Sequence, residues 1–209
     1  MNHDPALDPP NQRSDQAHPV EVNVGMPNEA RGSLGSMPTL VHEPAPMEFL
    51  ELLEKRRRLG LDRRDEVREG VLHMIPPPSV EHERLAHRLH VLLDGAAEAA
   101  GLAVTGTIGI GSKDDYCVPD VVVLRAGYQP QWNATAALAV EIVSPDDDTW
   151  EKLPFYGAHH VDEVVIVEPE KRQVHWLRLA GEEYETLERS GLLAGLGPVE
   201  LTRQLDWPE

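Results

Sequence analysis

Two nearly continuous apolar runs, each interrupted by a single acid, constrain the fold of this chain more than any other feature. Residues 116–124 read Tyr-Cys-Val-Pro-Asp-Val-Val-Val-Leu, and residues 136–143 read Ala-Ala-Leu-Ala-Val-Glu-Ile-Val. Strands that are apolar on both alternating faces belong to a sheet that is covered on both sides, usually by helices. The two runs therefore predict central strands of an α/β fold.

The acids inside these runs, Asp120 and Glu141, both need a partner. An uncompensated carboxylate in an apolar interior is costly, so each must be protonated, paired with a cation or bound to a metal. For either acid alone, an ion pair with a nearby Arg or Lys is the simpler explanation. Two such acids on neighbouring strands, followed closely by Lys152, favour a shared cation.

A short helix after the Glu141 strand brings Lys152 near both acids. Residues 146–156 read Asp-Asp-Asp-Thr-Trp-Glu-Lys-Leu-Pro-Phe-Tyr, and an Asp can cap a helix that begins here. We expect the three Asp residues to cap and solvate its start.

We assign Trp150 to the core. Aromatic residues make up only 5% of the chain, which argues against a surface for stacking on single strands.

The composition changes near residue 46 and divides the chain into a tail and one domain. Residues 1–46 hold eight of the 18 prolines and few large apolar residues, which predicts a disordered tail. Residues 47–209 are long enough for a single hydrophobic core. We expect helices at 47–59, between Ser79 and Gly101, and at 148–158, and strands at 66–75, 102–110, 116–124, 136–143, 162–167, 173–179 and 183–188.

The longest predicted helix carries a buried stripe and an inward-facing histidine. Ser79 is a good N-cap for it. His82 lies three residues before Leu85, so it should face inward near free backbone N–H groups that can meet a phosphate. A zincin-type zinc site is rejected, because His87 follows His82 at five residues instead of four. The stripe, at spacings of 4, 3 and 4, consists of Leu85, Leu89, Leu92 and Ala96.

Charge and composition limit the partners and the location. With 19 basic and 36 acidic residues the net charge is −17, which repels nucleic acid. Residues 55–58 and 63–64 could form a local basic patch, although a solvated helix end explains them equally well. The chain has no apolar run that could span a bilayer and no signal-peptide pattern, so we expect a cytoplasmic protein without membrane contact. Cys117, the single cysteine, is expected to be a small buried hydrophobe.

The succession of motifs resembles a known family. Its residues are Val-Pro-Asp at 118–120, Val-Glu-Ile-Val-Ser-Pro at 140–145, Trp-Glu-Lys-Leu-Pro-Phe-Tyr at 150–156 and Val-Ile-Val-Glu-Pro at 165–169. They are similar to the Uma-type restriction endonuclease family of the PD-(D/E)XK nuclease superfamily, over about residues 47–190. This resemblance implies a restriction-endonuclease-like core, a mixed central sheet flanked by helices.

The resemblance also implies a site in which acids on adjacent strands hold Mg²⁺ or Mn²⁺ and a lysine assists the attacking water. Matched by motif, Asp120 and Glu141 are the paired acids. The usual lysine of the superfamily stands two residues after the second acid, where this chain has Val143. The Uma-type family carries it on the next helix, where this chain has Lys152.

Two further positions match the family. Glu69, before the Pro-rich segment 76–78, corresponds to an early acid and would be a third metal ligand. A solvent-facing acid before a hairpin glycine explains Glu69 equally well. His82 corresponds to a recurring position and is predicted to bind substrate.

Together these features predict a metal-dependent endonuclease that hydrolyses phosphodiester bonds, in DNA more than in RNA. Lys152 would bind the scissile phosphate or orient the water, and oxygen ligands favour Mg²⁺ or Mn²⁺ over zinc. The strong acidity favours an alternative, a catalytically silent relative that binds nucleic acid or protein. A metal-dependent hydrolase of another phosphoester also fits, and a homodimer is left open as the assembly.

Overall fold

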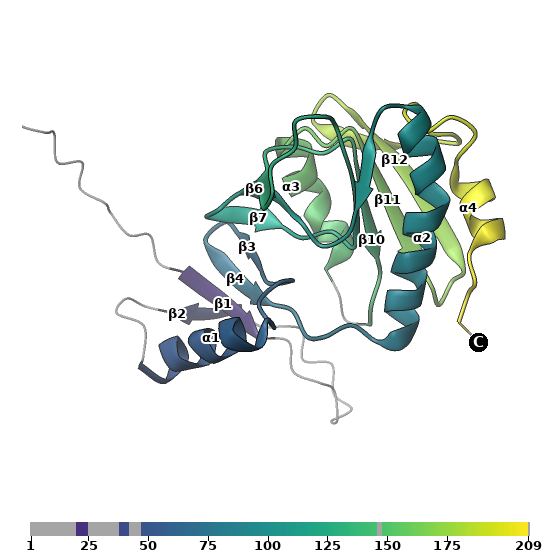
Figure 1. Cartoon of the computed structure of the whole chain (residues 1–209). Coiled ribbons are helices and arrows are strands. Elements are labelled where there is room, and N and C mark those ends of the chain that lie inside the picture. Colours follow the sequence, from purple (N-terminus) through teal and green to yellow (C-terminus); the bar gives the residue numbers. More distant parts are fainter. Residues whose placement is uncertain (1–19, 25–37, 42–46, 146–147, 209) are drawn as a thin grey trace, which may run out of the picture.

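Two β-sheets with helices around them make up the described part of the protein (Figure 1). The structure is a computed structural model that describes residues 20–24, 38–41, 47–145 and 148–208. Within these residues, no helix has the length and apolar character required to cross a membrane.

The six-stranded sheet carries the two apolar runs at its centre. β10 pairs in parallel with β11 and antiparallel with β8, which confirms a mixed central sheet. In spatial order its strands are β13 (Glu183–Thr186), β12 (Gln173–Ala180), β11 (Glu163–Glu168), β10 (Leu138–Ile142), β8 (Val121–Leu124) and β5 (Ala103–Thr105).

Both faces of this sheet are covered, as its apolar strands predicted. One face packs against α2 (Val80–Ala99) and α4 (Pro198–Gln204), and the other packs against α3 (Leu153–Ala158) and part of the second sheet (Figure 1). Every residue of β8 and β10 is buried. The burial of acids inside these strands is therefore real and requires compensation.

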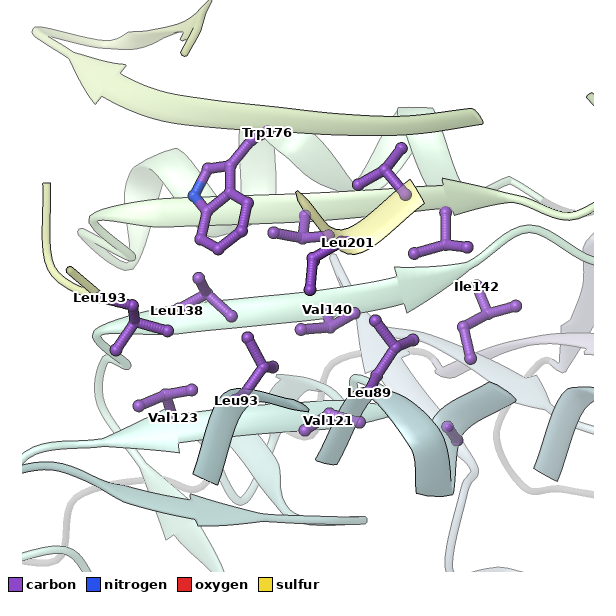
Figure 2. Packing of buried hydrophobic residues seen from close by; sticks show 14 of the residues in the cluster. Leu89, Leu93, Val121, Val123, Leu138, Val140, Ile142, Trp176, Leu193 and Leu201 are labelled. Carbon is purple, nitrogen blue, oxygen red and sulfur yellow. The ribbon is translucent and has the colours of Figure 1, made fainter. Parts of the chain in front are cut away.

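The core between α2 and the sheet is built from interlocking aliphatic side chains. Leu89 and Leu93 of α2 lie against Val121 and Val140, with Trp176 of β12 in the same cluster (Figure 2). Of the predicted stripe, Leu85 and Leu89 are buried, and Leu92 and Ala96 are partly buried and pack against the same cluster. The stripe follows an i, i+4 ridge that slants across the sheet, and its residues are Leu85, Leu89, Leu93 and Ala97.

A seven-stranded sheet lies beside this core. Helix α1 (Met47–Leu59) precedes its strand β3 in the sequence, and its bounds match the predicted helix. β1 and β2 fall in the segment that was predicted to be a disordered tail, and the rest of residues 1–46 lies outside the described residues. In spatial order the strands are β2 (Pro38–Val41), β1 (Val20–Val24), β4 (Val71–Met74), β3 (Glu66–Arg68), β7 (Asp115–Cys117), β6 (Gly109–Ser112) and β9 (Trp132–Asn133).

Three predicted strands each turn out to be two. Segment 66–75 is the β3–β4 hairpin, and its turn residues Glu69 and Gly70 have φ angles of 52° and 78°. Positive φ at both central positions defines the two-residue turn that suits the twist of a hairpin. Segments 102–110 and 116–124 are each divided between the two sheets, the latter around Pro119, which cannot donate to a ladder.

The α2–sheet core yields a stability prediction. Leu89 is fully buried, so Leu89→Ala should lower the free energy of unfolding by about 2–5 kcal/mol, through lost transfer energy and the cavity left behind. Val91 lies on the same helix and is 51% exposed, so Val91→Ala should change it by no more than about 0.5 kcal/mol. Urea denaturation of both variants measures the difference, and equal losses would contradict this packing.

The single cysteine yields a second prediction. Cys117 is fully buried, and burial together with the nearby Glu66 carboxylate raises the pKa of its thiol well above the ordinary value. Because the thiolate is the reactive form, the folded protein should not react with an aromatic disulfide reagent at pH 8. Unfolding in guanidinium chloride should release one thiol per chain, and rapid reaction of the folded protein would refute the burial.

Candidate functional site

Asp120 lies in the connection that carries the chain from the seven-stranded sheet into β8. Its backbone N–H donates to Val140 O at 3.0 Å, and its Oδ2 accepts from the N–H of Ile142 at 2.8 Å. The carboxylate is therefore fixed beside the end of β10, next to Glu141.

Two basic side chains face the Asp120 carboxylate. Arg64 Nη2 contacts Oδ1, and His82 Nε2 lies 3.3 Å from Oδ2. Burial alone would raise the pKa of Asp120, but the hydrogen bond and charge of His82, with Arg64 and the N–H of Ile142, outweigh it and lower the pKa. His82 faces inward, as predicted, and Ser79 caps its helix by accepting from the His82 N–H at 3.2 Å.

Glu141 extends from the middle of β10 toward the α3 side of the sheet. Its Oε1 accepts a hydrogen bond from Lys152 Nζ at 3.2 Å and another from the hydroxyl of Tyr156. Lys152 is the last residue of the 3₁₀ helix η1 (Thr149–Lys152), and Tyr156 is one turn further along in α3. The structure thus brings together Glu141 and Lys152, two of the residues selected from the sequence.

A third carboxylate, Glu66 of β3, completes this cluster. Its Oε1 accepts from Lys152 Nζ at 2.9 Å and from the Val118 N–H at 2.9 Å. Arg68 Nε lies 3.5 Å from Oε2, which is buried and accepts no hydrogen bond. Lys152 therefore bridges an acid of the seven-stranded sheet and an acid of the six-stranded sheet.

The electrostatics of this group follow from its burial. Burial raises the pKa of Glu141, the Lys152 cation lowers it, and repulsion from Asp120 and Glu66 raises it further, to about 8. Burial would lower the pKa of Lys152, but the carboxylates of Glu141 and Glu66 hold it well above the ordinary value. The Lys152 ammonium therefore stays charged. Its single positive charge does not offset the effect of burial and of the two neighbouring carboxylates on Glu141.

Glu69 is not part of the cluster. It occupies the exposed turn of the β3–β4 hairpin, where its N–H donates to Asp115 Oδ1 at 3.2 Å. Glu66, three residues earlier, was not selected from the sequence, because the early acid of the family was matched to Glu69. The Glu-Gly turn signal at 69–70 places Glu69 in the hairpin turn and leaves Glu66 as the acid of the strand.

Other charged residues near the site are also paired. The Asp148 side chain makes no capping hydrogen bond to η1 and contacts Arg68 instead, while Asp146 and Asp147 lie outside the described residues. Within the basic patch suggested by the sequence, Arg56 hydrogen-bonds Asp65 and Arg64 contacts Asp120. Arg64 therefore adds positive charge at the site, whereas Arg56 is paired within its own segment.

The acids and the lysine are almost closed to solvent, and more exposed groups border them. Side-chain exposure is 1% for Glu66, 5% for Glu141 and 10% for Lys152. Asp148 at 36% and Arg64 at 20% lie at the edge of the group. Trp150, predicted to be core, is 42% exposed, because the 3₁₀ turn that buries Lys152 directs it outward.

The donors suit a hard divalent cation in their chemistry. Asp120, Glu141 and Glu66 offer carboxylate oxygens, which Mg²⁺ and Mn²⁺ prefer. Oε2 of Glu66 is buried without a hydrogen bond, and burial together with repulsion from Asp120 and Glu66 raises the pKa of Glu141. Among the described residues no three acidic, histidine or cysteine side chains converge as a ready-made metal site, since Asp120 turns toward Arg64 and His82.

The fold defines the chain as an α/β protein of nuclease-like architecture. A crystal structure described as a "putative nuclease" from Anabaena variabilis ATCC 29413 aligns with a TM-score of 0.57 over 66% of this chain and 88% of that chain. The two sequences are 15% identical, so the likeness establishes the fold alone. Residues 47–206 match the Uma2 family, described as "Putative restriction endonuclease", and the chain belongs to this family.

A second solved structure and a search of curated sequences give no support beyond this family match and fold. A complex of DrdV with DNA, seen by electron cryomicroscopy, aligns over 55% of this chain and 10% of that chain at 16% identity. Its TM-score of 0.33 is too low to support a common fold. The curated protein sequences contain no match. The family resemblance and the fold class predicted from the sequence are confirmed by the family match and the Anabaena structure.

The buried bridge predicts a large effect of removing its cation. Lys152→Met leaves Glu66 and Glu141 without their shared partner, so it should lower the free energy of unfolding in metal-free buffer by about 3–5 kcal/mol. Lys113→Met is the control, because Lys113 is 73% exposed and its ion pair is worth about 1 kcal/mol at most. Equal denaturation midpoints for the two variants would show that Lys152 does not hold the acids.

Proposed function

We propose that this protein is a metal-dependent nuclease of the PD-(D/E)XK type that hydrolyses phosphodiester bonds. The observation that carries the proposal is the buried Lys152 ammonium, which binds Glu141 at 3.2 Å and Glu66 at 2.9 Å beside Asp120. A scaffold without chemistry would gain more stability from apolar residues at these positions. Membership of the Uma2 family supports the same conclusion.

Asp120, Glu141 and Glu66 are the residues that would hold Mg²⁺ or Mn²⁺. The bound cation would neutralise phosphate charge and lower the pKa of a water molecule. Glu66 takes the place expected for Glu69, because it alone of the two reaches Lys152. The role predicted for Glu69 stays a prediction without geometric support.

Lys152 acts as a fixed positive charge in this proposal. Its pKa lies well above the ordinary value, so the amine is not a proton acceptor near neutral pH. A positioned ammonium stabilises negative charge that develops on the phosphate during attack. Tyr156, which donates to Glu141, and His82, which faces Asp120, orient these two carboxylates.

DNA is the proposed substrate, because the family is described as restriction endonucleases. The net charge of −17 opposes binding of any polyanion. Arg64 and Arg68, at the border of the acidic cluster, offset this repulsion locally. The acidity also favours a second candidate, a silent module of the same fold that binds protein or nucleic acid.

A cleavage assay separates the two candidates. Plasmid, linear duplex DNA, single-stranded DNA and RNA are incubated with Mg²⁺, Mn²⁺ or EDTA, and products are resolved on gels. We expect cutting only with a divalent metal and losses of about 10²–10³-fold for Glu141→Gln and Lys152→Ala, as for other charge-stabilising groups. If no substrate is cut, the protein is the silent module. If both variants cut like the wild type, the cutting does not come from Glu141 and Lys152 and the proposed site is wrong.

A second pair of variants identifies the third acid. Glu66→Gln keeps the shape of the side chain but removes the charge that faces Lys152, so cleavage should fall by about 10²-fold or more. Glu69→Gln alters only the hairpin turn, and cleavage should stay within about two-fold of wild type, since the change is a surface substitution. The reverse pattern would return the metal role to Glu69.

A further inference from the structure

Trp150 is placed unusually for a tryptophan beside a buried site. It is 42% exposed, whereas Trp176 in the core is fully buried. It lies on η1, two residues before Lys152, so the same short helix presents the buried lysine and the exposed indole. An exposed indole offers a flat surface on which another ring can stack.

A chain of contacts holds this indole in place. The Trp150 ring meets the His175 ring edge-on, with centroids 5.0 Å apart and planes at 75°. His175 Nε2 lies 2.9 Å from Glu168 Oε2, and Lys171 Nζ lies 2.6 Å from Glu168 Oε1. The Glu168 side chain is 9% exposed and is held by both partners, so it fixes the position of the His175 ring. The Lys171 side chain remains 66% exposed.

The side chains of Trp150, His175 and Glu168 lead away from the acidic cluster along the same face of the sheet. Glu141 of β10 pairs with Ile166 of β11, which pairs with His175 of β12. Residues paired in this way point to the same face, and strands lie about 4.8 Å apart, so His175 is about 10 Å from Glu141. Trp150 precedes Lys152 by two residues on η1 and contacts His175, and His175 shares the Glu168 carboxylate with Lys171.

From this arrangement we infer that Trp150 stacks on an unpaired base next to the scissile phosphate, with His175 and Lys171 beside the following phosphate. The site therefore takes a single-stranded or locally unpaired polynucleotide. The inference rests on the proposed nuclease function and narrows its substrate class. Stacking suits this protein, because a base presents an uncharged face whereas the net charge of −17 repels phosphates.

Binding of matched strands tests the inference. The probes are a labelled oligothymidylate of about twelve nucleotides, within the usual site sizes of single-strand binders, and an abasic strand with the same number of phosphates. Ca²⁺ replaces Mg²⁺, since it takes the same oxygen donors. Wild-type protein should bind the base-bearing strand about ten-fold more tightly than the abasic strand, and Trp150→Ala should lose this preference.

Two controls separate stacking from general damage. Trp132 is 36% exposed on β9 in the other sheet, so Trp132→Ala should retain the preference for bases. Trp150→Phe keeps an aromatic ring and should retain most of it. Lys171→Ala should weaken both strands equally and reduce the dependence of binding on salt by about one phosphate contact. Thermal melting of each variant verifies folding.

Each outcome decides a different claim. If Trp150→Ala keeps the wild-type preference, or if wild-type protein binds both strands equally or binds neither, the stacking inference is wrong while the nuclease proposal stands on its cleavage assay. If wild-type protein neither binds nor cuts any nucleic acid, both are wrong.

Discussion

One buried ammonium group, that of Lys152, connects the two sheets at the candidate site. Lys152 on η1 bridges Glu66 of the seven-stranded sheet and Glu141 of the six-stranded sheet, at 2.9 Å and 3.2 Å. An ion pair of this kind gains little net stability, because desolvation of the charges offsets their attraction. It does fix geometry, since any displacement of one sheet would leave a carboxylate unpaired in an apolar interior.

The sequence predicted the centre of the fold well because burial imposes strong patterns. Residues 121–124 and 138–142 are strands of the covered sheet, as their uninterrupted apolar sequence predicted, although residues 116–117 belong to the other sheet. The acids of the two apolar runs, Asp120 and Glu141, could be selected for the same reason. Periodicity was less reliable at segment 66–75, where a hairpin of short strands has the composition of one long strand.

The remaining site residues depend on contacts that no local pattern encodes. Glu66 lies at the start of a short strand, and its proximity to Lys152 arises from pairing of β3 with β7. Arg64 reaches Asp120 across 56 positions of the sequence, and Tyr156 reaches Glu141 across 15. Trp150 was assigned to the core from its residue type, although the 3₁₀ geometry of its turn decides which neighbour is buried.

The sequence separation of the bridge bears on the order in which the protein can fold. Glu66 and Lys152 are 86 positions apart, so their contact closes a long loop. Contacts between distant segments slow folding, because the entropy of closing the loop is lost before the contact stabilises the chain. During synthesis the chain presents Glu66, Asp120 and Glu141 before Lys152 has been made. The bridge can therefore form only once residue 152 has joined the chain.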